Sequence, residues 1–237
     1  MNNLLRALVD LRDRQIQKGR IQFGNRLSAL ERHTDTSAGS GQAQIVERWL
    51  ARFHEMEQEL DKDILRVVKD EPIYEQLSEL KGIGPMLAAK LIAFIDIDRA
   101  NTVSALWRYA GYAVIDGERE RPTKGEKLHY NRRLKTTCYL IASSFLKCNS
   151  PYRAIYDSSK ARYEQTKPDW TKGHIHHAAM RRMIKIFLSH LWVCWRELEE
   201  LPVTRPYVHQ QLGHTTVFEP AEFGWPVLTA IGVAISE

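Results

Sequence analysis

A stripe of large apolar residues between positions 45 and 67 constrains the fold most strongly. Charged residues separate its members, which recur at intervals of three and four: Ile45, Trp49, Phe53, Met56, Leu60, Ile64 and Val67. This spacing places them on one face of a helix and is typical of a coiled-coil seam. The pattern stops at 70–72 (Asp-Glu-Pro), because a residue before proline disfavours the helical conformation. We expect a long coiled-coil-like helix that pairs within the chain or joins copies of the chain through residues 43–69.

The whole sequence predicts a mainly α fold in three parts. Residues 1–72 are expected to form an N-terminal helical and coiled-coil region, with one or two short helices before a linker at 34–42 that is rich in Ser, Thr and Gly. Residues 73–200 form a helical domain, and residues 201–237 form an extended, proline-containing tail that packs on it. Apolar periodicity predicts helices near 74–80, 85–95, 103–109, 132–145, 152–165 and 175–193. The polar stretch 113–130, with its Gly and Pro residues, predicts a small hairpin or loop.

Composition excludes two classes of protein. A chain of 237 residues with 43% hydrophobic residues is too apolar to be disordered over most of its length. Its longest apolar run, 227–235, is about half of the ~20 residues that a membrane-spanning helix needs. The three cysteines, Cys138, Cys148 and Cys194, form no CxxC pair. We therefore expect free thiols in a cytoplasmic protein.

The basic charge is concentrated in the middle of the sequence. The chain as a whole has a formal net charge of +5, but residues 118–185 alone hold 16 basic and 6 acidic residues, and residues 42–100 are net acidic. A basic block of this kind usually faces a phosphate backbone, although a solvated basic surface is the alternative. The distribution favours a nucleic-acid partner.

The most informative motif is the string LKGIGPMLAAKL at 80–91. Two glycines flank an apolar residue, and a proline follows at a position well suited to the first turn of a helix. Glycines let backbone N–H groups and a helix N-terminus approach a phosphate. This pattern predicts a helix-hairpin-helix that holds the DNA backbone with little base readout; the alternative is an ordinary turn between two helices. The candidate contacts are Lys81, Gly82, Ile83, Gly84 and Lys90.

Further basic residues extend the candidate nucleic-acid surface. They are Arg119, Arg121, Lys124, Lys127, Arg132, Arg133 and Lys135, with Arg181 and Arg182 on the last long helix. Three aromatic residues nearby, Trp107, Tyr109 and Tyr112, either stack on bases or belong to the core. Near the start of that last helix are His174, His176 and His177, which could bind metal or phosphate. No cysteine or carboxylate completes a ligand set there, so a polar helix start is expected and no metal or other cofactor is predicted.

Several motifs occur together in one order along the chain. After the long helix and the 80–91 string come WRYAGY at 107–112, a basic loop with Gly117 and Gly125, and NRRLK at 131–135. SPY at 150–152 and AAMRR at 178–182 follow. In this order, residues from about 45 to 192 resemble the coiled coil and the C-terminal serine-transposase domain, with its helix-hairpin-helix, of the insertion-sequence transposases of the 110/116/902 group.

The resemblance implies DNA recombination. In that family, a resolvase-like N-terminal domain binds a divalent metal through clustered carboxylates, a serine of the C-terminal domain is the nucleophile, and the oligomer holds a structured guide RNA. This sequence departs from the pattern, because residues 1–41 are too short for the metal domain and Asp10, Asp13 and Asp35 show no strand-borne carboxylate pattern.

The second departure concerns the nucleophile. Asp116-Gly117 stands where the family has a serine before a glycine, and a carboxylate does not readily replace a hydroxyl in making a phosphodiester adduct. Between Tyr112 and Tyr130, Thr123 carries the one aliphatic hydroxyl and is the remaining candidate nucleophile.

The sequence therefore predicts a transposase-like DNA-binding protein without independent strand-transfer activity. Its expected partners are DNA, structured RNA and further copies of the chain through residues 43–69, and no membrane. Two alternatives stay open. One is an active transposase or recombinase that works with a partner or through an unassigned hydroxyl; the other is a structural adaptor whose hairpin only packs helices.

Overall fold

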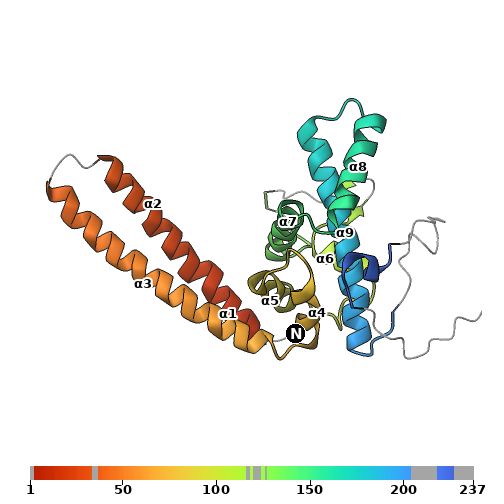
Figure 1. The fold of residues 1–237 in the computed structure, drawn as a ribbon, viewed down its shortest axis with the longest axis horizontal. Helices are drawn as coiled ribbons and strands as arrows, with labels where there is room; N and C mark the ends of the chain where they lie inside the picture. Colours follow the sequence, from red (N-terminus) through yellow and green to blue (C-terminus); the bar gives the residue numbers. More distant parts are fainter. Residues whose placement is uncertain are drawn as a thin grey trace, which may run out of the picture. The chain divides into compact units, whose positions relative to one another are not determined.

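The computed structural model describes residues 3–33, 37–115, 118–119, 124–125, 127–203 and 218–226. The chain divides into two compact units, one of residues 2–71 and one made of residues 72–237 together with Met1. Helices dominate both units (Figure 1), which confirms the mainly α fold. Among the described residues, no helix is both long and apolar enough to cross a membrane. The three cysteines are free thiols.

The N-terminal unit is a helical hairpin. Its first arm runs without a break through α1 (Asn3–Leu11), a π-helical turn η1 (Arg12–Ile16) and α2 (Gln17–His33). The second arm is α3 (Ser37–Val68), which packs along the first (Figure 1). The prediction of one or two short helices before residue 34 is wrong. So is the full extent of the 34–42 linker, because residues 37–42 already belong to α3.

Close packing between the two arms explains the unbroken first arm. The Phe53 ring lies so near Gly19 that a Cβ added to Gly19 would be 2.6 Å from a ring carbon. Phe23 also contacts Phe53, with ring centroids 5.4 Å apart. A glycine costs about 1 kcal/mol in an isolated helix relative to alanine. Here the missing side chain makes room for the partner helix, so tertiary contact outweighs local propensity.

The buried face of α3 only partly coincides with the predicted seam. Leu60 and Ile64 are buried as predicted, but Ile45, Trp49 and Met56 are 54%, 45% and 47% exposed. Their inward positions are taken by the neighbouring Val46 and by Glu57, both buried. The helix is therefore rotated relative to the prediction, because its inward face includes a glutamate that pairs with arginines of the first arm.

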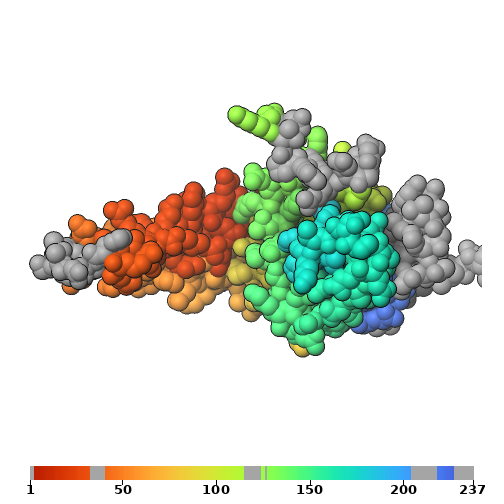
Figure 2. All heavy atoms as spheres, turned by 90° about the horizontal axis from the view of Figure 1, so that it is seen from above, coloured from red at the N-terminus to blue at the C-terminus, as the bar shows by residue number. Residues whose placement is uncertain are grey.

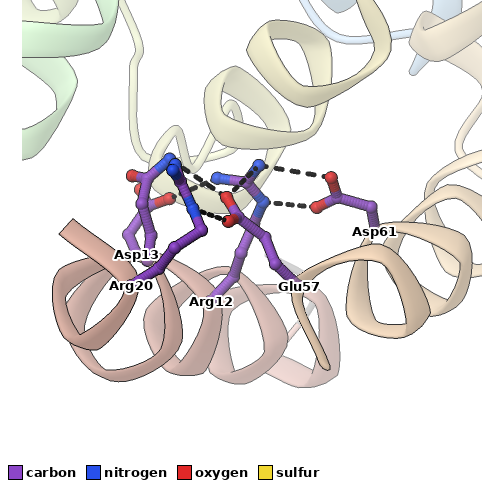
Figure 3. A network of polar contacts seen from close by, with 6 residues as sticks. Arg12, Asp13, Arg20, Glu57 and Asp61 are labelled. Atoms are coloured by element: carbon purple, nitrogen blue, oxygen red, sulfur yellow. Dashed lines mark hydrogen bonds and ion pairs between the residues drawn. The ribbon is translucent and has the colours of Figure 1, made fainter. Parts of the chain in front are cut away.

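A buried polar network ties the two arms together (Figure 3). Arg12 forms ion pairs with Asp61, with Glu57 at 3.0 Å and with Asp13 at 3.2 Å, while Arg20 pairs with Glu57 from the next turns of the first arm. Burial opposes the charge on Arg12, but its hydrogen bond and attraction to Asp61 outweigh burial and raise the pKa of Arg12 above its usual value. Because these arginines meet the carboxylates of α3 only when the two arms are aligned in this way, the ion pairs favour one register of the hairpin.

The C-terminal unit is a helical domain built around α9 (Lys172–Leu198). Its other helices are α4 (Pro72–Glu79), α5 (Pro85–Phe94), α6 (Val103–Tyr109), α7 (Arg132–Lys147), α8 (Arg153–Thr166) and the 3-10 turn η2 (Pro220–Phe223). The helix α9 packs against α4, α6, α7 and α8. Strands β1 (Val114–Ile115) and β2 (Glu118–Arg119) pair antiparallel within the stretch predicted to hold a small hairpin.

An aromatic cluster forms the centre of this unit. The rings of Phe145 and Tyr152 stack with centroids 4.9 Å apart, and Phe187 of α9 meets Phe145 edge-on at 5.4 Å. All three side chains are fully buried. The cluster joins the end of α7, the start of α8 and the middle of α9, so it fixes the helices that carry most of the basic residues.

Residues 218–226 are held to this cluster by a chain of hydrogen bonds. Nε2 of His190 donates to the Phe218 carbonyl at 2.8 Å, which leaves Nδ1 of the neutral ring as an acceptor for the Tyr152 hydroxyl at 2.7 Å. The indole N–H of Trp225 donates to the same hydroxyl at 2.7 Å. The polar atoms of His190, Tyr152 and Trp225 thereby all have hydrogen-bond partners, and burial lowers the pKa of His190 to about 4.

Candidate nucleic-acid interface

The turn between α4 and α5 is fixed against α7. Ile83 N–H donates to the Leu80 carbonyl at 3.0 Å, and Gly82 has a φ of +104°, a conformation that favours glycine. A Cβ on Gly82 would lie 2.8 Å from Sγ of Cys148. The Ser144 hydroxyl donates to the Gly82 carbonyl at 2.7 Å. Gly82 is therefore required both by its backbone conformation and by its contact with α7.

The other side of this turn is exposed. Lys81 and Gly84 are exposed, whereas Ile83 is buried and Lys90 is half-buried. Gly84 caps α5 with an ordinary negative φ, Pro85 follows at the first helical position, and a Cβ on Gly84 would meet nothing within 4 Å. Of the five predicted contacts in this motif, Lys81 and Gly84 have the access that a phosphate needs, while Gly82 and Ile83 hold the turn in shape.

The basic start of α7 lies at the far end of α5. Asn131 caps α7 by accepting hydrogen bonds from the N–H groups of Arg133 and Leu134, at 3.0 and 3.1 Å. The Arg133 guanidinium lies over the Phe94 ring, 4.3 Å from its centroid. Because Ser144 contacts Gly82 and Arg133 contacts Phe94, α7 runs antiparallel to α5. The ten residues of α5 rise about 15 Å, so the two basic sites are separated by about that length.

Not all of the predicted basic loop can be placed. Arg132, Lys124 and Lys127 are exposed, and the Lys135 ammonium lies 4.2 Å from the Tyr130 ring centroid. The backbone of Arg119 belongs to β2. Arg121 lies outside the described residues, as do Asp116 and Thr123, the two positions considered for a nucleophile.

Basic groups gather along α8 and α9. Burial lowers the pKa of Arg182, and the nearby charge of Arg162 lowers it further. Burial likewise lowers the pKa of Lys185, with a second contribution from Arg181. For His176, burial is again the largest cause of a lowered pKa, followed by His177 and Lys160. These shifts come from burial and like charges, so a bound anion would stabilise the charged forms.

The three aromatic residues near the basic loop have structural roles. The Trp107 indole N–H donates to the Lys185 carbonyl at 3.0 Å, and the Lys185 ammonium lies 3.9 Å from the centroid of the same ring. The Asn131 amide donates to the Tyr109 hydroxyl at 2.9 Å. Tyr112 is buried, which raises the pKa of its hydroxyl. Of the two interpretations of these rings, the structure favours the core.

The histidines at the start of α9 separate into different contacts. Nδ1 of His176 lies 2.7 Å from the Tyr156 hydroxyl, and the His174 ring stacks on Trp170. Within the part of the chain that the structure describes, no group of three or more His, Cys, Asp or Glu side chains could hold a metal ion. The Trp170 contact was not anticipated from the sequence, although Trp170 lies between two lysines in a short turn and could have drawn attention there.

The helices that carry the candidate turn and the basic start of α7 are similar to part of a known family. Residues 74–157 match the model of the transposase IS116/IS110/IS902 family. This part of the protein is therefore similar to a transposase family. The chain is also similar to the insertion element IS110 uncharacterized 43.6 kDa protein of Streptomyces coelicolor, with 27% identity over 176 residues, or 71% of this chain. The chain spans about 41% of the length of that relative. No solved structure matches the chain. The family match includes α5, α6 and α7, and ends within α8, before α9.

Proposed function

We propose that this protein binds DNA through its phosphate backbone as part of a transposition machinery. The gathering of basic side chains on α8 and α9, with Arg162 near Arg182 across the two helices and Arg181 near Lys185 along α9, carries the proposal. Within a folded domain, burial and like charge disfavour the charged forms of Arg182 and Lys185. A polyanion stabilises such charges, and each neutralised phosphate also releases counterions. The transposase-family match indicates that the polyanion is DNA.

The exposed turn at Lys81–Gly84 is proposed as the second contact, in the manner of a helix-hairpin-helix. The N-terminus of α5 offers the positive end of the helix, and Gly84 presents no side chain to an approaching phosphate. The exposed Arg132 at the start of α7 adds a third contact. A separation of about 15 Å between these two places corresponds to roughly four base-pair steps of 3.4 Å along a duplex. One duplex could therefore touch both.

We further propose that the chain does not transfer strands by itself. The support is Asp116-Gly117 at the position where the resembled family has its serine. The competing function is an active recombinase that uses Thr123 with a partner. A nicked DNA substrate distinguishes the two, because an active enzyme leaves a covalent protein–DNA adduct that survives denaturation and disappears in Thr123→Ala. Such an adduct would contradict the proposed lack of strand transfer.

We also propose that copies of the chain associate through residues 43–69. The support is the second apolar stripe of α3, formed by Ile45, Trp49 and Met56, which lies exposed on the hairpin. Light scattering during size exclusion measures the mass of the full chain directly. Trp49→Glu should reduce that mass, whereas Lys62→Glu, at an exposed position of α3, should leave it unchanged. A wild-type mass equal to the monomer would contradict the proposal.

Salt dependence tests DNA binding most directly. The affinity of the full chain for a short duplex, a four-way junction and a structured RNA is measured by fluorescence anisotropy over a series of salt concentrations. Binding should weaken steeply with salt, and Lys81→Ala should lower the slope of log K against log salt by about one, since one phosphate contact is lost. Lys62→Ala, which removes the same charge from α3, should leave the slope unchanged. A flat salt dependence, or no binding to any of the three, would exclude the proposed function.

The variant Gly84→Ala tests whether the turn contacts nucleic acid or only packs helices. A Cβ at Gly84 meets nothing within 4 Å, so the variant should fold normally. If a phosphate approaches the backbone there, the affinity for DNA should fall while the melting temperature stays. Unchanged affinity in the folded variant would favour the structural adaptor, whose hairpin only packs helices.

A further inference from the structure

The turn between α8 and α9 carries a cluster of aromatic and basic side chains that the family match does not reach. We call it the tip cluster; it consists of Arg162, Tyr163, Lys167, Trp170 and His174. Figure 1 shows α8 and the first half of α9 running side by side beyond α7, and Figure 2 looks down on the end of this pair, coloured cyan. The family match ends at residue 157, before the cluster begins.

Two rings of the tip cluster are stacked, and a third lies beside them at an angle of 42°. Trp170 and His174 are stacked with centroids 4.0 Å apart and an interplanar angle of 6°. Tyr163 lies on the Trp170 side, with its centroid 5.6 Å from that of Trp170. The Arg162 guanidinium lies 5.0 Å from the Tyr163 ring and the Lys167 ammonium 5.9 Å from the Trp170 ring. Cations therefore lie beside the stacked pair of rings and beside the tilted Tyr163 ring.

Backbone contacts hold this stack in place. Trp170 N–H donates to the Lys167 carbonyl at 3.0 Å, and the Thr171 hydroxyl caps α9 by accepting from the His174 N–H at 3.2 Å. His174 is exposed, whereas Trp170 and Tyr163 are half-buried. Trp170 stacks on His174, and because His174 is exposed, part of its imidazole is accessible to a flat ligand.

We propose that the tip cluster binds single-stranded DNA. An unpaired base extends the Trp170–His174 stack on the accessible part of the His174 ring, and Arg162 and Lys167 hold the adjacent phosphates. The inference rests on the proposed DNA-binding function and names the form of DNA that this part of the surface takes. Aromatic side chains that stack on successive bases, next to a basic track for the backbone, are the general means of binding single strands.

Stacking chemistry favours a single strand over a duplex at this place. In a duplex, both faces of each internal base are covered by neighbouring base pairs, so an exposed ring can stack on an unpaired base but not on an internal pair. Cations without exposed rings would bind the backbone of a duplex and of a single strand alike. The charge also suits a polyanion, because residues 160–185 contain seven lysines and arginines against two acidic residues, Glu164 and Asp169. The cluster thus complements both features of a single strand. Its cations suit the negative backbone, and its exposed ring suits the open faces of the bases.

The test compares His174 variants of the full chain on two DNA ligands. The probes are a labelled oligothymidylate of about 16 nucleotides, which has no secondary structure, and a duplex of similar length. His174→Ala should weaken oligothymidylate binding by about 5- to 150-fold, the effect expected for losing one stacked base. His174→Phe keeps a flat ring and should restore most of the affinity. Gln165→Ala, an exposed change near the same turn, is the matched control and should have no effect.

Duplex affinity decides how the result is interpreted. For the tip cluster to be the single-strand site, His174→Ala must leave duplex affinity unchanged. Equal losses on both ligands, or no loss on oligothymidylate, would overturn the inference. A loss confined to oligouridylate, used as a third probe, would overturn the assignment to DNA. If wild type binds oligothymidylate through His174 but binds no duplex, the proposed backbone site fails and the tip cluster stands; if it binds duplex but no oligothymidylate, the tip cluster fails alone.

Discussion

Acidification should destabilise the C-terminal unit through His190. This side chain is buried and neutral, with Nε2 donating to the Phe218 carbonyl and Nδ1 accepting from Tyr152. Protonation would place a second N–H where the Tyr152 hydroxyl now donates. That hydroxyl could turn to accept only by giving up its own donor bond, and the charge would still be buried. Burial is the main cause that lowers the pKa of His190 to about 4.

The sign and size of the effect follow from proton linkage. The unfolded chain takes up this proton near the ordinary histidine pKa of about 6.5, while the folded protein resists it down to about 4. Between these values the unfolded state binds more protons, so stability is complete above about pH 6.5 and falls as the pH drops. At about pH 5 the loss amounts to about 2 kcal/mol relative to pH 7.5, at about 1.4 kcal/mol for each pH unit below 6.5.

Urea unfolding monitored by tryptophan fluorescence measures this loss. Five of the six tryptophans lie in residues 72–237, so the signal reports mainly on the unit that contains His190. His190→Gln is the comparison, because glutamine can keep hydrogen bonds but does not titrate. Between about pH 7.5 and 5, the free energy of unfolding should fall by about 2 kcal/mol more in the wild type than in the variant, since the other histidines contribute equally to both. Parallel pH profiles for the two proteins would refute the assignment to His190.

Two further predictions concern packing and charge. Gly82→Ala should lower the free energy of unfolding by about 1–3 kcal/mol, because its Cβ would clash with Cys148 at a positive φ, whereas Gly84→Ala should change it by less than about 1 kcal/mol. Thermal melts of the two variants give the comparison, and equal effects would contradict the role assigned to Gly82. Arg12→Ala should destabilise the helical hairpin by about 1–3 kcal/mol, less than a fully buried pair because Asp61 is partly exposed. Removing Glu57 as well should cost less than the sum of the single changes; strict additivity in that double-mutant cycle would show that the two side chains do not interact.

Local sequence signals predicted the helical elements and the shape of the candidate turn. Pro85 begins α5, Asn131 caps α7, and the positive φ of Gly82 is one that glycine adopts readily. Each of these depends on residues within one helical turn of one another, so the sequence contains the whole interaction. The uneven charge was equally visible, because it requires only counting. The basic block at 118–185 and the string at 80–91 therefore predict a nucleic-acid surface from the sequence alone.

Which face of a helix is buried, and what lies across from it, was decided only by the tertiary structure. The predicted α3 stripe divides in the structure. Leu60 and Ile64 turn inward beside Glu57, which pairs with Arg12 and Arg20, while other members of the stripe stay exposed. The antiparallel run of α7 along α5 set the turn and the basic start of α7 about 15 Å apart. The His190 network and the Trp170–His174 stack likewise depend on how a turn or a distant segment packs. Sequence alone determined the elements and their charge, because these are local. The partners across the fold depended on which surfaces could be buried together while their buried polar groups found hydrogen-bond partners in most cases.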